Sequence, residues 1–274
     1  MYVSVAVMDT GIFRHMDFDT RIAGFADFVG RKKYLYDDNG HGTHVAGIIA
    51  GSGKGSNGKY RGIAPDTFLV SVKVLDKSGN GKIENVVEAA GWIIENKSAM
   101  NIRVVNISFG TRAKMENGPA IETGEDDYAL IMAVEKMWDS GIVVVAAAGN
   151  NGPGNTSVTA PGISKKIITV GAFDDKYFFS GRGPTRECIV KPEVVVTGSN
   201  IIACNNHQGR YSSKSGTSMA APVVSGAVAR LIKNNPDITP KEVKIWMKSC
   251  CKKINVPSEK QGWGVLDIRK FVTG

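Results

Sequence analysis

A single serine lies where a helix is predicted to begin. Residues 216–218 read Gly-Thr-Ser, and apolar residues then recur at helical spacing through 223–232. The first N–H groups of a helix have no partner within the helix and carry partial positive charge, so they favour an attacking anion. Ser218 is therefore a candidate nucleophile. The alternative is that Thr217 or Ser218 only caps the helix.

A serine hydroxyl needs a neighbouring base to take its proton, and that base works best when a buried carboxylate orients it. The chain has four histidines. His41 has glycine on both sides and precedes a small-residue helical stretch, so backbone and substrate can approach its ring closely. His44 lies on the adjoining helical face, and we expect it to pack inside the protein. His15 and His207 stand in polar loop sequence, and we expect both at the surface.

Two polar residues end apolar runs that are typical of buried parallel strands. Asp9 follows residues 3–8, and reactive groups in open α/β sheets gather beyond the carboxyl ends of strands. Asn150 ends the run 143–150, and its side-chain N–H could meet an oxyanion together with the N–H of Ser218. Each residue could instead be an ordinary turn residue.

These four motifs, in the order Asp9, His41, Asn150 and Ser218, resemble the subtilisin-like serine proteases, and the resemblance runs nearly end to end. It implies that Asp9 orients His41, which acts as general base and acid. It also implies that Ser218 is the nucleophile and Asn150 the amide of the oxyanion hole. The implied activity is that of a serine endopeptidase, which hydrolyses peptide bonds through an acyl-enzyme on Ser218.

Two other functions remain open at this point. A catalytically silent relative could bind peptides or regulate another protease, although such proteins usually lose a residue of the triad. An esterase or peptide ligase could use the same triad, because acyl transfer to water, alcohol or amine begins with the same acyl-enzyme.

Composition and periodicity agree with one α/β domain over residues 1–274. The chain is 42% hydrophobic and long enough for a sizeable core. Strands alternate with helices, which predicts a mostly parallel central sheet with helices on both faces, as in the subtilisin-like fold that the resemblance implies. Beyond the runs already named, the predicted strands are 68–74, 103–108, 167–172 and 193–196, and the predicted helices are 83–96, 126–140 and 240–248.

The resemblance also indicates where a peptide substrate would bind. Ser108, Phe109 and Gly110 resemble the family segment that pairs with residues before the scissile bond, and the loop holding Gly79 and Gly81 resembles the opposing wall. Those glycines could equally form a plain turn.

Small residues would line the pocket for the side chain that precedes the cut. They are Ala147, Ala148 and Gly149 together with residues 160–162. We expect this pocket to prefer a bulky apolar residue.

We expect no required cofactor and no strong metal site. Many family members bind calcium in the loop after the histidine helix, but here residues 51–59 contain lysines and no carboxylate, which Ca²⁺ usually needs. Asp37 with Asp38, or the acidic run 125–127, could hold calcium weakly. Solvated loop or helix-start charges are the alternative.

The net charge of +8 comes from scattered lysines and arginines without an aromatic-interleaved basic stripe. We therefore expect protein or peptide substrates and no nucleic-acid partner. No apolar run is long enough for a membrane span, so we expect no membrane partner either.

The four cysteines, Cys188, Cys204, Cys250 and Cys251, have no disulfide-framework spacing and are expected to be free thiols. Because the first strand also begins directly after Met1, we expect a cytoplasmic location. The alternative is secretion, if this sequence is a trimmed mature form.

Overall fold

The fold is built on a nine-stranded sheet in a computed structural model that describes residues 2–111, 124–176 and 178–274. Its strands are β1 (Ser4–Asp9), β2 (Ile22–Asp27), β3 (Phe68–Lys73), β4 (Ile102–Ile107), β5 (Val143–Ala147), β6 (Ile168–Ala172), β7 (Val194–Val196), β10 (Cys251–Lys252) and β11 (Val265–Leu266). Their order across the sheet is β10-β11-β7-β6-β5-β4-β1-β3-β2, and every pair is parallel except β10 with β11. A separate antiparallel ribbon consists of β8 (Ile201–Cys204) and β9 (Tyr211–Lys214).

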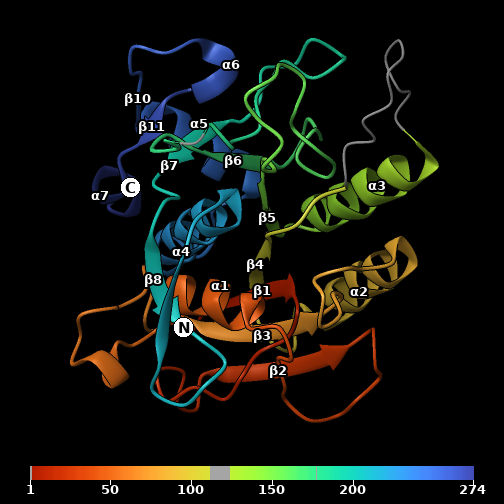
Figure 1. Ribbon diagram of the computed structural model, residues 1–274, viewed down its shortest axis with the longest axis vertical. Helices are drawn as coiled ribbons and strands as arrows, with labels where there is room; N and C mark the ends of the chain where they lie inside the picture. The colour runs from red at the N-terminus through yellow and green to blue at the C-terminus, as the bar shows by residue number, and fades with distance from the viewer. Residues whose placement is uncertain (1, 112–123, 177) are drawn as a thin grey trace.

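Helices cover both faces of this sheet (Figure 1). They are α1 (His41–Ala50), α2 (Ile83–Asn96), α3 (Glu125–Asp139), α4 (Thr217–Asn234), α5 (Pro240–Ser249), α6 (Ser258–Gln261) and α7 (Ile268–Val272), with a short 3₁₀ turn η1 (Lys54–Ser56). α1 and α4 pack together on one face, whereas α2 and α3 pack together on the other. Among the described residues, no helix combines the length and apolarity that a bilayer span requires.

Burial on both faces explains why the central strands are nearly continuous apolar runs. All six residues of β1 are buried, and their side chains alternate between two cores. Val5 and Val7 join the core under α1 and α4, while Ala6 and Met8 join the core under α2 and α3. The predicted α/β class and parallel sheet are confirmed.

Most element boundaries agree with prediction, but the short and exposed elements were not predicted. α2 has the expected bounds, and the other named runs match within a residue or two, apart from β5, which ends at Ala147 and not at residue 150, and α4, which begins before its apolar run. β2 was missed because its residues, apart from the last, are exposed or only partly buried. β10 and β11 have two residues each, too few to show a period.

The sheet brings two distant segments together at the carboxyl ends of its strands. β1 lies beside β4 with Met8 opposite Ile107, so the next residues, Asp9 and Ser108, are neighbours at the same edge. Adjacent strands lie about 4.8 Å apart. The pairing of β1 with β4 therefore fixes how far apart Asp9 and Ser108 lie.

Two helix glycines provide a matched test of how tightly α1 is packed. A Cβ at Gly47 in α1 would lie 2.8 Å from the Cys204 backbone nitrogen and 3.0 Å from its Sγ, whereas a Cβ at Gly91 in α2 would meet nothing within 4 Å. We expect Gly91→Ala to raise the free energy of unfolding by about 0.5–1 kcal/mol, because alanine favours helix. Gly47→Ala should lower it by about 1–3 kcal/mol through overpacking.

Parallel denaturant unfolding of the two variants and the parent checks this prediction. A stabilising Gly47→Ala would show that α1 and the β8–β9 ribbon are packed more loosely than the structure has them.

Candidate active site

Asp9 and His41 form the best-defined pair at the sheet edge. Asp9 ends β1 with a fully buried side chain, and His41 opens α1 with a side chain that is 24% exposed. His41 Nδ1 lies 2.8 Å from Asp9 Oδ1 and 3.0 Å from Oδ2, so the ring donates from Nδ1 and leaves Nε2 as the atom that can accept a proton. The N–H of Thr10 also donates to Asp9 Oδ1.

The surroundings of His41 set its proton affinity. Burial alone would lower the pKa of His41, but the charge of Asp9 and its hydrogen bond outweigh this effect. The pKa of His41 therefore lies above its ordinary value of 6.5. The positive charge of Lys214 in β9 acts in the opposite direction.

Buried Asp37 fixes the start of α1. Its Oδ1 accepts hydrogen bonds from Thr10 Oγ1 and the N–H of Gly40, and its Oδ2 accepts from the N–H and hydroxyl of Thr43. Burial would raise the pKa of Asp37, but these donors hold it below its ordinary range. The carboxylate thus joins the segment after β1 to the first turn of α1, which carries His41.

Gly42 allows this close approach. A Cβ on Gly42 would lie 2.3 Å from the carbonyl oxygen of Gly11 and 3.2 Å from Asp9 Cβ. The glycine after His41 is therefore required by packing against the β1 end, and not only for access of a substrate.

Ser218 is the second residue of α4, as the sequence predicted for a residue at a helix start. Its hydroxyl donates to the carbonyl oxygen of Ser108 at 2.8 Å, and Ser108 Oγ donates to the carbonyl of Ser218 at 3.0 Å. No hydrogen bond joins Ser218 to His41 among the described residues. The two residues are nevertheless held at neighbouring strand ends, because His41 is hydrogen-bonded to Asp9, Ser218 is hydrogen-bonded to Ser108, and Asp9 lies beside Ser108.

A buried chain of polar groups supports Ser218 from below. Ser225 Oγ in α4 donates to Asn106 Oδ1 in β4, and Asn106 Nδ2 donates to Ser108 Oγ. Each of these buried side chains has a hydrogen-bond partner, so the network leaves none of the three without one. The sequence suggested Ser108 as a substrate contact. In the structure its side chain is turned toward Asn106 and Ser218, and the predicted contact with substrate, which was through the backbone of residues 108–110, stays a prediction.

Asn150 lies beyond β5 and next to the start of α4. Its Oδ1 accepts from the N–H of Thr217 at 3.0 Å and from Thr217 Oγ1 at 3.1 Å. These contacts fix the amide and leave Nδ2 as its donor. Asn150 and Ser218 line the same cavity.

This cavity has a volume of about 430 Å³, and none of the described residues that line it is charged. Its wall includes Phe109, Gly110 and Gly149, three of the residues that the sequence analysis expects to contact substrate. Thr159 also lines it and was not singled out, because no motif marks it. A Cβ at Gly110 would lie 2.3 Å from Thr159 Oγ1, and one at Gly149 would lie 2.8 Å from it. The threonine thus fills space between the two glycines.

The remaining predicted substrate contacts divide into two groups. Gly79 and Gly81 line a larger cavity of about 860 Å³ that also reaches Phe109 and Gly110. Ala148 is fully buried, its N–H donates to Val170, and it does not line either described cavity. Side chains along an extended segment alternate in direction, so Ala147 and Gly149 line the cavity of about 430 Å³ whereas Ala148 between them does not.

The candidate calcium ligands have other partners. Asp37 holds the start of α1, and Asp38 accepts from Lys73 Nζ at 2.8 Å. Residues 125–127 form the first turn of α3, where the helix dipole stabilises acidic side chains. In the loop 51–59, the N–H groups of Gly53 and Gly55 donate to Asp17, so the loop offers this carboxylate donors instead of cation ligands.

One histidine expectation was wrong. His15 is buried, with 1% of its surface exposed, because the loop after β1 folds under the β8–β9 ribbon, and its Nε2 bonds to the carbonyl of Arg210. His207 is exposed, and His44 is buried with its Nε2 donating to Ser212, as expected. All four cysteines are free thiols.

Known proteins resemble this chain along most of its length. Serine protease AprX of Bacillus subtilis (strain 168) is 42% identical over an alignment that covers 90% of this chain and 60% of AprX. Subtilisin DY of Bacillus licheniformis is 35% identical over 244 residues, which cover 88% of this chain and 81% of that protein. The crystal structure of a cold-adapted subtilisin-like serine proteinase superposes with a TM-score of 0.76 at 30% identity, covering 96% of this chain and 86% of that one.

A model of the Subtilase family matches residues 2–264. That match includes every residue of the site described above, from Asp9 to Ser218. The chain therefore belongs to the subtilase family.

Proposed function

We propose that this protein is a serine endopeptidase in which Ser218 attacks the peptide carbonyl and His41 takes its proton. The observation that carries the proposal is the hydrogen bond from His41 to buried Asp9. Asp9 lies beside Ser108, and Ser108 is hydrogen-bonded to Ser218. The proposed mechanism requires the Ser218 hydroxyl to leave Ser108 and turn toward His41 Nε2 by rotation about the Cα–Cβ bond of Ser218. Such rotations take picoseconds to nanoseconds.

The reaction we propose needs only side chains and backbone of this chain. Ser218 Oγ bonds to the carbonyl carbon as its proton passes to His41, and the oxyanion is met by Asn150 Nδ2 and the N–H of Ser218. The C–N bond then breaks as His41 protonates the leaving amine. Water, activated by His41, hydrolyses the acyl-enzyme, so no cofactor is required.

The substrates we propose are proteins or peptides, held with the residue before the cut in the cavity of Thr159 and Gly149. The uncharged lining supports an apolar residue there. Gly79, Gly81 and Gly110 would flank the preceding residues.

We further propose that residues 1–274 form one peptidase unit, since β1 near the start and β11 near the end belong to one sheet. Free thiols support a cytoplasmic location.

A fluorophosphonate probe tests the catalytic assignment. We expect the probe to label Ser218 in the parent and not in Ser218→Ala, and we expect that variant to lose about 10⁶ in kcat, a magnitude that belongs to subtilisin itself. Mapping the labelled peptide by mass spectrometry gives the residue. An unlabelled parent would favour the catalytically silent alternative.

Matched peptide amides and esters, assayed with the same preparation, separate protease from esterase. Efficient ester turnover with negligible amide cleavage would count against the endopeptidase.

The pH profile tests the role of His41. The base must be neutral, and the pKa of His41 is raised, so kcat/KM should rise with pH through a midpoint above 6.5. Lys214→Gln removes a charge that lowers this pKa, so the midpoint should move to higher pH. A midpoint that stays in place or moves downward in Lys214→Gln would contradict this account of the electrostatics.

Thr159 is expected to set the size of the residue accepted before the cut. Thr159→Gly removes the side chain between Gly110 and Gly149, so the ratio of kcat/KM for a phenylalanine peptide over an alanine peptide should rise about tenfold or more. Peptide pairs that differ only at this residue measure the ratio. An unchanged ratio, or strict cleavage after acidic residues, would rule out this pocket assignment.

A further inference from the structure

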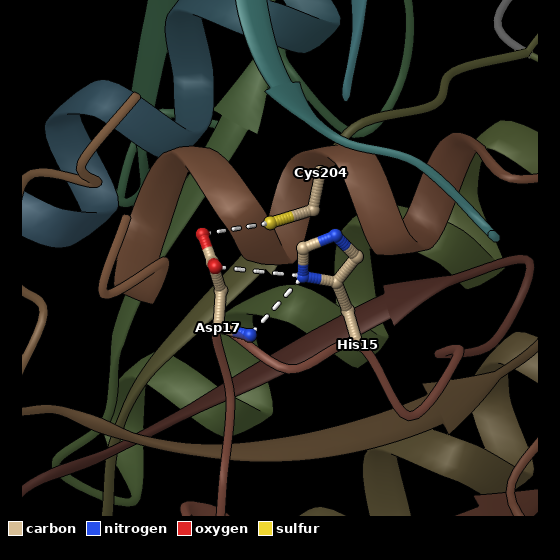
Figure 2. A group of neighbouring side chains, drawn as sticks. All are labelled: His15, Asp17 and Cys204. Carbon is tan, nitrogen blue, oxygen red and sulfur yellow. Dashed lines mark hydrogen bonds and ion pairs between the residues drawn. The ribbon is translucent and has the colours of Figure 1, made fainter. Parts of the chain in front are cut away.

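Three side chains of different ligand chemistry meet under α1, away from the proposed active site. His15 and Asp17 lie in the loop after β1, and Cys204 ends β8 (Figure 2). All three residues are buried, and their ligand atoms lie within 4.8 Å of one another. Figure 2 shows the Cys204 thiol next to one carboxylate oxygen of Asp17 and the His15 ring next to the other.

The separations are close to those that one small ion imposes. Asp17 Oδ1 lies 3.7 Å from His15 Nδ1, and Asp17 Oδ2 lies 3.5 Å from Cys204 Sγ. Zinc bonds of about 2.0–2.3 Å in a tetrahedron place neighbouring ligand atoms about 3.3–3.7 Å apart. The carboxylate therefore presents one oxygen to each of the other two ligands at roughly this spacing.

His15 already has the tautomer that a metal ligand needs. Its Nε2 donates to the carbonyl oxygen of Arg210 at 3.1 Å, and its Nδ1 accepts from the N–H of Asp17. The Nδ1 lone pair is thus on the side of the ring that faces Asp17, and an ion bound there would replace the hydrogen bond from the Asp17 N–H. Metal-binding histidines typically fix their other ring nitrogen on a carbonyl or carboxylate in this way.

The charge of the cluster also favours a cation. Asp17 is fully buried, and its carboxylate accepts from neutral donors, namely the N–H groups of Gly53 and Gly55, the hydroxyl of Tyr211 and the thiol of Cys204. Within the described ranges, no lysine or arginine pairs with it, and Arg21 bonds to its backbone carbonyl instead. A buried carboxylate without a cation is costly, and a divalent ion with a thiolate would make the site neutral.

We propose that His15, Asp17 and Cys204 form a structural site for a thiophilic divalent cation of the zinc class. Sulfur and imidazole select such ions over calcium, which prefers oxygen ligands. Binding exchanges the thiol proton for the metal, so one proton is released to solvent for each ion bound. The thiol no longer donates to Asp17, whose oxygens then face the ion.

The ion would stabilise the fold and take no part in peptide hydrolysis. Cys204 packs against Gly47, six residues after His41 in α1, or about 9 Å along the helix. The site would join the loop after β1 to the β8–β9 ribbon. Because the site is buried, the ion would enter during folding or through local opening.

Metal content measured on the intact protein tests the proposal. The protein is produced in the Ser218→Ala background, which prevents self-cleavage, with zinc or cadmium in the medium. We expect native mass spectrometry to find one ion per chain, and the cadmium protein to show the ultraviolet absorption of a cadmium–thiolate bond. We also expect the metal-loaded protein to unfold at a higher temperature than the chelator-treated protein.

Matched cysteine variants locate the ion. Cys204→Ser keeps a donor for Asp17 but removes the soft ligand, so it should fold and lose the ion, and Cys204→Ala gives the same readout if the serine variant does not accumulate. Cys188→Ser, at an exposed cysteine, should retain the ion. A parent that binds no ion would overturn the proposal. Binding that survives in Cys204→Ser and disappears when Cys250 and Cys251 are replaced would also overturn it.

Discussion

The hydrogen bond between buried Asp9 and His41 is the interaction on which the proposed chemistry of this molecule depends. A carboxylate without solvent at the end of β1 needs donors, and the imidazole is the one that also reaches the open side of the site. The bond selects the tautomer of His41 and raises its pKa. The surrounding structure serves this bond, because Asp37 holds the start of α1 and Gly42 lets the helix approach the end of β1.

Ser218 depends on a second constraint, the pairing of β1 with β4. Ser108 continues β4 beside Asp9, and two hydrogen bonds tie it to Ser218. Asn106 and Ser225 complete the polar chain beneath it. Ser218 is therefore held by a parallel sheet whose register is set by two buried faces, and a shift of one residue would reverse both faces of β1.

The proposed metal site has a different relation to the fold. Its residues lie on the loop after β1 and on the β8–β9 ribbon, which pack on α1 beyond its first turns. The same helix thus carries His41, the proposed general base, at one end and packs against the cluster farther along. In this arrangement the proposed ion would act on stability, whereas Asp9, Ser218 and Asn150 would act on the reaction.

The sequence by itself determined the family, the α/β class, the main strands and helices, and the four residues proposed for catalysis, because long apolar runs and short polar motifs are local signals. Only the tertiary structure decided what lies beside what. His15 is buried under the β8–β9 ribbon, whose strands the sequence pattern did not predict. The Ser108 side chain points inward, Ala148 is buried, and Thr159 lies between two glycines. Those outcomes depend on contacts between segments far apart in the chain, which no local pattern of residue types records.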